Sequence, residues 1–350
     1  MKINLLSNNI PWFGKYSGYE CLPNYFSDLQ PSIYSAKPTL SNRAMGRWYR
    51  FLNNWDDTNS EQAYTGLTFL RGSKKVDLSH ILYLETHLHL LKKTNLISDK
   101  ILGTIHLPVR QWEEKNLKLL SGLSNLIVLY KEEIDRFKMY TNEARIHFIQ
   151  HGVDIGFFRP GDPQLVNKNK VLFVGHYLRN FDMMLKVYNT ITNEISDKVE
   201  FHFIIPSIWR GNIPVLQNIG RNKNVFFHEK LSDEELLLQY QTSNILLMPM
   251  EDSGANTAIV QAVSIGLPVV TTDVGGIRSY GGADIFPIID NNNHLLMVEL
   301  FNKYFTQREF RDEISVAQRN YAINNLDWNI IANKHAALYD DCILQYKPKQ

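Results

Sequence analysis

Cysteine is scarce in this chain of 350 residues, and long apolar runs are absent. The two cysteines, Cys21 and Cys342, show neither the spacing of a metal site nor the number that a disulfide framework needs, which fits a reducing compartment. No uncharged apolar stretch is long enough to span a bilayer, and the first residues lack the pattern of a signal peptide. We therefore expect a cytoplasmic protein without a transmembrane anchor.

An excess of charge of one sign is also missing. Lysine and arginine number 37 and aspartate and glutamate 36, a net charge of +1, so the composition gives no sign of a nucleic-acid partner. The fingerprint G-x-G-x-x-G does not follow the first predicted strand, which argues against a dinucleotide-binding fold. No Asp-x-Asp pair stands where a metal-diphosphate site would need it, and no His/Cys cluster has ligand spacing. We expect no required metal and no resident cofactor.

Length and periodicity indicate two α/β domains. The chain is longer than one core usually requires, and strands alternate with helices along most of it, which is typical of parallel sheets covered on both faces. We predict one domain over residues 1–160, a second over 161–327 and a C-terminal helix over 328–350. The predicted strands are 3–6, 76–85, 101–106, 125–129, 145–149, 170–175, 200–205, 224–227, 245–248 and 269–272.

Residues 251–277 combine a small-residue loop, a helix and a buried strand. Ser253 and Gly254 suit the loop, and the helix is predicted to begin near Asn256, with its apolar residues on one face. Gly266 ends the helix before a β-branched strand and a Gly-Gly turn. Because the first backbone N–H groups of a helix point at whatever lies in front of them, this stretch predicts an anion site.

The whole run, EDSGANTAIVQAVSIGLPVVTTDVGGI, resembles the nucleotide-sugar signature of GT-B glycosyltransferases, especially the retaining family 4. That signature reads roughly E-G-F-G-x-x-x-x-E-A-x-A-x-G-x-P-V-[IV]-x-[ST]-x-x-G-G. Ser253 replaces its first glutamate, Asn256 its second loop glycine and Gln261 its second glutamate. Seven further residues fit as they stand: Ala262, Gly266, Pro268, Val269, Asp273, Gly275 and Gly276.

This resemblance implies a fold and an activity. The fold would be GT-B, two doubly wound Rossmann-like domains facing each other across a cleft, with the C-terminal helix crossing back to the first domain. The activity would be retaining transfer of a hexose-type sugar from a nucleoside diphosphate sugar to a saccharide or lipid-linked acceptor, in polysaccharide or glycoconjugate synthesis. Two alternatives stay open: a non-catalytic nucleotide-sugar-binding protein, because both glutamates are replaced, and another enzyme class on the same fold, a sugar-nucleotide epimerase or a hydrolase.

The resemblance also implies the parts of a donor site. Diphosphate and sugar would meet the helix start, formed by Ser253, Gly254, Ala255, Asn256 and Thr257. The ribose would meet Gln261, whose amide can accept a hydrogen bond without the strength that a carboxylate adds. The base would lie on the segment with His228 and Lys230, held by backbone groups. Gly18, in the loop after the first strand, would either let backbone approach the donor or belong to an ordinary turn.

A positive charge is needed to offset the leaving diphosphate. His176 occupies the place of the family's arginine, and Arg179 is the nearest fixed positive charge. A guanidinium can hold phosphate oxygens with two parallel hydrogen bonds, so we assign this role to Arg179. Lys186, two helical turns further on, is either a second cation or a solvent-exposed helix residue.

Two residues of the first domain are candidates for the chemical step. His106, at a strand end, resembles the histidine that family members direct at the reacting sugar, and a satisfied core or surface histidine is the alternative. Glu85, at the end of the preceding strand, could orient the acceptor or act as a base, and its alternative role is to cap the following helix.

Residues 43–55 form a basic amphipathic segment. Three arginines share one predicted helical face, and Trp48, Phe51, Leu52 and Trp55 share another. Such a segment can rest on an anionic membrane surface, which would place the protein at the inner membrane face. The alternative is a helix packed on its own domain with its arginines in water.

Overall fold

A computed structural model describes residues 1–8, 10, 14–36, 39–55, 58–92, 100–141 and 145–346. Their contacts divide the chain into two compact units. The described parts of residues 1–11, 18–150 and 329–350 form the first unit, and those of 12–17 and 151–328 form the second. Each unit is described by itself.

The first unit contains a six-stranded parallel sheet in the order β2-β1-β3-β4-β5-β6. The strands are β1 (Ile3–Leu6), β2 (Ser32–Tyr34), β3 (Leu78–Ile81), β4 (Ile101–Ile105), β5 (Asn125–Val128) and β6 (Ile146–Phe148). Apolar residues of these strands form one buried core with residues of α1 (Leu40–Asn53), α2 (Ser60–Ser73) and the helices after β4. The prediction of a first strand over residues 3–6 is confirmed.

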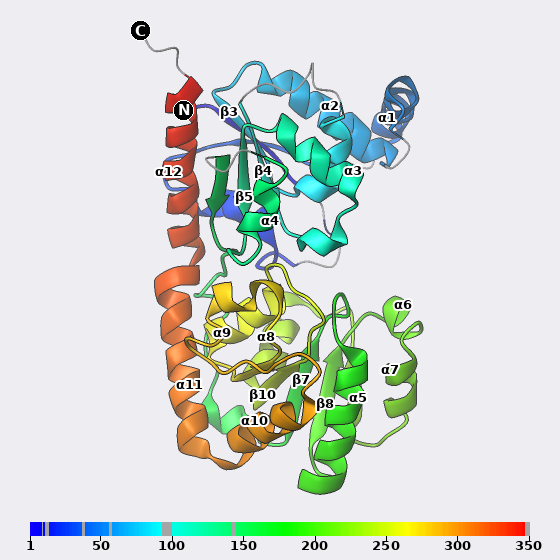
Figure 1. Ribbon diagram of the computed structural model, residues 1–350, viewed down its shortest axis with the longest axis vertical. Helices are drawn as coiled ribbons and strands as arrows, with labels where there is room; N and C mark the ends of the chain where they lie inside the picture. The colour runs from blue at the N-terminus through cyan, green and yellow to red at the C-terminus, as the bar shows by residue number, and fades with distance from the viewer. Residues whose placement is uncertain are drawn as a thin grey trace. The chain divides into compact units, whose positions relative to one another are not determined.

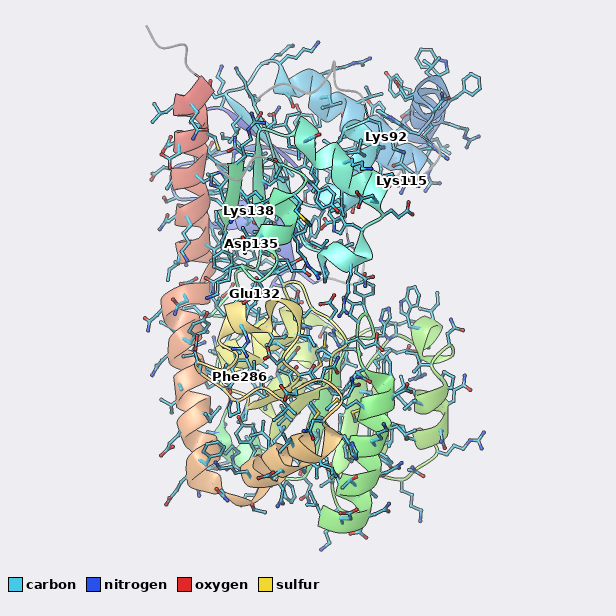
Figure 2. All side chains as sticks on the ribbon, in the orientation of Figure 1. Lys92, Lys115, Glu132, Asp135, Lys138 and Phe286 are labelled. Atoms are coloured by element: carbon cyan, nitrogen blue, oxygen red, sulfur yellow. The ribbon has the colours of Figure 1, made fainter. Side chains whose placement is uncertain are left out.

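Helices of the first unit cover this sheet (Figure 1). They are the 3-10 helices Tyr19–Tyr25, Leu84–Leu90, Val109–Gln111 and Lys118–Gly122, and α1 (Leu40–Asn53), α2 (Ser60–Ser73), α3 (Glu114–Leu117), α4 (Ile134–Lys138) and α12 (Trp328–Tyr346). Buried hydrogen bonds tie α12 to the rest of the unit, since His335 contacts Tyr19 at 2.6 Å and Tyr339 contacts His80 at 2.7 Å. Figure 2 draws the side chains, with Asp135 and Lys138 of α4 labelled.

The second unit contains a five-stranded parallel sheet in the order β11-β10-β7-β8-β9. The strands are β7 (Lys170–Val174), β8 (Glu200–Ile204), β9 (Val225–His228), β10 (Ile245–Met248) and β11 (Val269–Thr271). The helices are α5 (Phe181–Thr190), α6 (Ser207–Arg210), α7 (Pro214–Ile219), α8 (Asp233–Gln241), α9 (Thr257–Ile265), α10 (His294–Thr306) and α11 (Arg308–Tyr321), the π-helical turns Ile191–Ile195 and Ala322–Leu326, and the 3-10 helices Pro163–Leu165 and Gly275–Tyr280. Two buried cores pack against this sheet, as expected when helices cover both faces. The predicted α/β class is confirmed.

The boundary between the units falls at 150/151, ten residues earlier than the predicted domain boundary after residue 160. Val153 and Phe158 are 3% and 0% exposed in a core of the second unit, and the backbone N–H of Val153 donates to Leu326 at 2.8 Å. Residues 14–17, which the sequence assigned to the first domain, also join the second unit. Because two side chains of residues 151–160 are buried in the second unit, this segment belongs to the second unit and not to the first.

Helix α1 confirms the predicted helix over most of residues 43–55. It packs on its own unit and exposes Arg43 and Arg47, as in the alternative, but the predicted apolar face is not the packed side. Trp48 and Phe51 are 59% and 80% exposed, whereas Gly46 and Tyr49 face the unit. Of the predicted apolar face, Trp55 alone is buried, and it lies beyond the end of α1. No helix in the described part of the chain is both long enough and apolar enough to cross a bilayer.

Candidate functional site

The second sheet changes its direction of growth between β7 and β10. The chain adds β8 and β9 on one side of β7 and then returns to add β10 and β11 on the other. In open parallel sheets, ligands bind beyond the carboxyl ends of the strands at such a switch point. The loops after β7 and β10 meet there, since Asn180 N–H donates to Pro249 and Glu251 N–H donates to Leu178, both at 2.9 Å.

Helix α9 begins at this switch point. Asn256 is its N-cap, and the side-chain oxygen accepts from the backbone N–H of Ile259 at 3.3 Å. The predicted start near Asn256 and the end at Gly266, which is left-handed with φ 76°, are both confirmed. The helix itself offers no partner for the N–H groups of its first two residues, Thr257 and Ala258. The Asn256 side chain thus caps the helix, and a helix start with such backbone N–H groups is the kind of place where proteins bind anions.

The loop before α9 is held by its own hydrogen bonds. Ser253 is 2% exposed, and its hydroxyl donates to the carbonyl of Gly254 at 3.0 Å. The carboxylate of Asp252, 3% exposed, accepts from Ser253 N–H, and Gly276 N–H donates to the Ser253 carbonyl at 2.7 Å. Glu251 is the exposed carboxylate of this loop. Gly254, Ala255 and Thr257 are half-buried.

Gln261 is buried inside the second unit, on the second turn of α9. Its amide Nε2 donates to the hydroxyl of Ser17 at 2.9 Å, which joins residues that are 244 positions apart in the chain. The neighbours of Ser17 are held in the same unit: Lys15 N–H donates to the Asp233 carboxylate at 2.8 Å, and the Tyr16 ring stacks on Phe157 at 3.9 Å. The loop before Gly18 thus forms part of the second unit beside α9. Gly18 itself has φ 94° and precedes the 3-10 helix Tyr19–Tyr25, so this turn requires a glycine.

Arg179 lies at the switch point with its guanidinium turned onto backbone carbonyls. Nε and Nη2 donate to Val174 at 3.1 and 2.8 Å, and Nη1 donates to Tyr177 at 2.8 Å. Burial lowers the pKa of Arg179 to about 10, so it remains charged at neutral pH. Three of its five N–H groups are used in these bonds, and the side chain secures the loop after β7 as well as carrying charge. Lys186 is exposed on α5.

An aromatic pair stands beside Arg179 that the sequence patterns did not reveal. The imidazole of His176 stacks on the indole of Trp209, with ring centroids 4.6 Å apart and planes 15° apart. Burial, and then the charge of Arg179, lowers the pKa of His176, which keeps this ring neutral. Trp209 remains 45% exposed, so part of the indole is open to a ligand. No periodic pattern marks this residue, because α6 is one short turn after β8.

The segment after β9 is the predicted base site. His228 turns its ring to the imidazole of His202, with the ring nitrogens 2.9 Å apart, so its side chain faces the sheet. Lys230 is exposed and left-handed at φ 54°. Between them, Glu229 accepts from the N–H of Ser207 at 2.6 Å and thereby fixes the start of α6 beside this segment. The side chain of His228 is therefore occupied, and any base contact at this position would come from backbone.

The first sheet has its own switch point, between β1 and β3, and Glu85 and His106 lie near it. One Glu85 carboxylate oxygen accepts from two backbone N–H groups, that of His106 and that of Leu107. The bond from Leu107 measures 2.8 Å. Burial raises the pKa of Glu85 to about 7. Nε2 of His106 donates to the carbonyl of Leu82 at 2.8 Å, which fixes the proton on that nitrogen in the neutral ring. Glu85 thus holds the turn that orients His106.

Aromatic residues around His106 were not predicted from the sequence. Its ring stacks on Tyr83 at 4.4 Å and meets the edge of Tyr19 at 5.0 Å. The Tyr83 hydroxyl donates to the carboxylate of Glu20 and accepts from Tyr19 N–H at 2.9 Å. Burial raises the pKa of Glu20. Hydroxyl, imidazole and carboxyl groups therefore gather at one end of the first sheet. The described residues contain no group of three or more His, Cys, Asp or Glu side chains arranged to hold a metal.

Comparison with known proteins agrees with the motif in residues 251–277. Residues 168–299 match the family described as Glycosyl transferases group 1. The chain resembles the group 1 glycosyltransferases. Over 133 residues, 38% of the chain, it is 22% identical to D-inositol 3-phosphate glycosyltransferase of Corynebacterium diphtheriae, and this match spans only 31% of that relative's length.

Solved structures share the fold along nearly the whole chain. A glycosyltransferase from Rickettsia africae has a TM-score of 0.72 at 15% identity, with 99% of each chain covered. Anabaena HepE, in complex with UDP and glucose, has a TM-score of 0.73 at 13% identity, over 97% of this chain and 100% of the other. Sucrose-phosphate synthase from Thermosynechococcus elongatus has a TM-score of 0.75 at 13% identity, over 98% of this chain and 99% of the other. The two parallel sheets are those of the GT-B fold.

Proposed function

We propose that the protein is a glycosyltransferase that moves a hexose-type sugar from a nucleoside diphosphate sugar to a saccharide or lipid-linked acceptor with retention of anomeric configuration. The observation that carries this proposal is the start of α9 at the switch point of the second sheet, within the region that matches the group 1 family. Free backbone donors of a helix start and a fixed guanidinium nearby suit a diphosphate. HepE, which shares the fold, is seen with UDP and glucose.

In this proposal the diphosphate lies at the N–H groups of Thr257 and Ala258, with Arg179 on the opposite side of the switch point. Two guanidinium N–H groups beyond its three backbone bonds are available for phosphate oxygens by count. Preorganised donors then meet the negative charge that develops on the leaving group. This lowers the barrier to breaking the bond between the anomeric carbon of the sugar and the diphosphate. The acceptor oxygen bonds to the anomeric carbon as the bond from that carbon to the diphosphate breaks, and the departing diphosphate takes the proton of the acceptor hydroxyl. No protein nucleophile is needed.

The nucleobase is proposed to lie between the His176–Trp209 pair and the segment after β9. The strand order β7-β8-β9 places the Trp209 turn between the loops that carry His176 and Lys230. An indole with an open face offers stacking to any base, and the backbone beside Lys230 offers hydrogen bonds. Glu251 is proposed as the carboxylate that meets the sugar, in place of the signature glutamate that Ser253 replaces in this chain. The other carboxylate of the loop, Asp252, is buried and bonded to Ser253 N–H.

One set of contacts favours a second candidate function, a non-catalytic nucleotide-sugar-binding protein. The side chains that replace the two glutamates and the second loop glycine all bond within the protein: Ser253 to Gly254, Asn256 to Ile259 and Gln261 to Ser17. A site so arranged could hold a donor and lack the groups that promote transfer. A sugar-nucleotide epimerase remains the third candidate, on the likeness of the fold alone.

One assay separates these candidates. The protein is incubated with UDP-, GDP-, ADP- and dTDP-sugars, with and without a set of saccharide and lipid-linked acceptors, and the products are examined by chromatography and proton NMR. Release of nucleoside diphosphate that depends on acceptor, with a product of the donor's anomeric configuration, supports retaining transfer. An inverted product contradicts it. An epimerised sugar nucleotide without acceptor indicates the epimerase, and binding without any turnover indicates the non-catalytic protein. Glu251→Gln is the informative variant, since it should bind donor and lose transfer.

A further inference from the structure

Helix α1 turns its apolar side chains away from the first unit. Five of them are exposed: Leu40 by 86%, Met45 by 42%, Trp48 by 59%, Phe51 by 80% and Leu52 by 53%. At 3.6 residues per turn these positions share an arc of about 140° around the helix axis. A surface helix of a globular protein normally buries such an arc. Side chains project outward along α1 in Figure 2.

The inner side of α1 fixes this orientation. A Cβ atom on Gly46 would lie 1.6 Å from the backbone oxygen of Ser60, so the close approach to the start of α2 requires a glycine. Tyr49 is 7% exposed, its ring lies parallel to Tyr64 at 6.4 Å, and Arg71 lies over it at 5.6 Å. Rotating α1 to bury Phe51 would lose these contacts. The apolar arc is therefore held outward by packing.

Positive charge borders the apolar arc. Residues 40–53 contain three arginines and no aspartate or glutamate. Arg43 and Arg47 are exposed one turn apart, beside a hollow of about 310 Å³ at the start of α2. Arg43 is paired with Glu61 at 2.6 Å, whereas Arg47 forms no hydrogen bond or ion pair with any residue that the structure describes. Arg47 is the cation left for an external anion.

We infer that α1 is an interfacial helix that binds an anionic lipid bilayer. A helix with an outward apolar arc, bulky aromatic residues and arginines along one border lies in the plane of a membrane, with its apolar side in the boundary between headgroups and acyl chains. Arg43 and Arg47 would then lie at the level of the lipid phosphates, where each basic residue adds attraction. A second copy of this chain is a poorer occupant, because a two-fold contact would bring the same arginines together.

The test is flotation of the whole protein with vesicles of phosphatidylcholine, with and without phosphatidylglycerol. The protein should float with the anionic vesicles, and high salt should reduce its binding. Phe51→Ser should lower the partition coefficient roughly tenfold or more, from the lost burial of one phenyl ring. Arg47→Ala should lower it about fivefold. Leu295→Ser is the matched control, since Leu295 is 64% exposed on α10 of the second unit and should leave partitioning unchanged.

A second readout reports which side chain enters the bilayer. The emission of Trp48 should shift to the blue on anionic vesicles, and Trp48→Phe should abolish that shift while vesicle binding persists. Absence of flotation on anionic vesicles overturns the inference, as does an equal loss in Leu295→Ser. A dimer in light scattering that Phe51→Ser dissolves would assign the surface to a second copy instead. Donor binding should be the same in Phe51→Ser and the parent, because the proposed donor site lies in the second unit.

Discussion

Gln261 and Ser17 are 244 positions apart in the chain, yet Nε2 of the glutamine donates to the serine hydroxyl at 2.9 Å within the second unit. Gln261 stands where the family carries a glutamate that is expected to meet the ribose. Its amide instead secures the loop before Gly18, which the contacts of Lys15 and Tyr16 hold in the same unit. The glutamine thus has a structural role whatever it contributes to a ligand.

Removing either partner of this hydrogen bond should cost stability, and removing both should cost less than the sum. We expect Gln261→Ala to lower the free energy of unfolding by about 2 kcal/mol, through a lost buried hydrogen bond and a small cavity. A cycle with Ser17→Ala, measured by urea denaturation, should give a coupling of about 1 kcal/mol. A coupling indistinguishable from zero would show that the contact contributes nothing.

Replacing Arg179 with lysine should harm the loop after β7 although the charge is kept. The donors of a lysine radiate from a single nitrogen and do not reproduce the planar fork in which Nε, Nη1 and Nη2 reach Val174 and Tyr177. We expect Arg179→Lys to lower the melting temperature and to weaken nucleoside diphosphate binding about tenfold, by calorimetric titration. Lys186→Ala, on the exposed face of α5, is the control and should match the parent. Parent-like binding in Arg179→Lys would mean that charge alone is needed.

The open face of the Trp209 indole should contribute to donor affinity by stacking on the nucleobase of the donor. Stacking of a base on an aromatic side chain contributes about 1–3 kcal/mol by alanine substitution, so Trp209→Ala should raise the donor Kd at least about fivefold. Trp209→Phe should retain most of the affinity. Ile208→Ser changes a 74% exposed neighbour on the same turn and controls for unspecific effects. Unchanged affinity for every nucleotide in Trp209→Ala would remove this residue from the site.

The titration of Glu85 predicts a pH-dependent difference in stability. Its pKa is about 7 in the folded protein, because burial favours the neutral carboxyl, against an ordinary value of 4.5. A group with a raised folded pKa stabilises the protein fully below its unfolded pKa, and this contribution is lost as pH rises through the folded value. Glu85→Gln does not titrate, so its melting temperature minus that of the parent should increase from about pH 5 to about pH 8. A difference that is flat with pH would contradict the shifted pKa.

Local patterns predicted the elements that local interactions decide. The strand β1 and the start and end of α9 follow from a short apolar run, a capping asparagine and a glycine after the helix, all readable within a few residues. The compact units divide at 150/151 and not after residue 160, because Phe158 enters a core built from distant segments. The spacing of apolar residues along the sequence does not show burial against residues that are far away in the chain.

The sequence predicted where the candidate site lies along the chain, but not which contacts its side chains make. The signature run identified the helix start. It did not show that the Asn256 side chain would bond to Ile259 N–H as the helix cap, because capping and ligand binding favour the same residue type. Arg179 could be predicted as a cation, yet its partners are backbone carbonyls, which every residue has. Trp209 and His176 meet through the strand order of the sheet, which no motif encodes.

The central claim is that the second unit binds a nucleoside diphosphate sugar at the start of α9. The most direct measurement is calorimetric titration of the parent protein with UDP-, GDP-, ADP- and dTDP-sugars and with the matching diphosphates and nucleosides. We predict saturable binding of one sugar nucleotide and of its diphosphate, with the nucleoside alone much weaker and Arg179→Lys impaired for both. If none of these ligands binds, or if the nucleoside binds as tightly as the diphosphate, the assignment of the anion site to α9 and Arg179 is wrong.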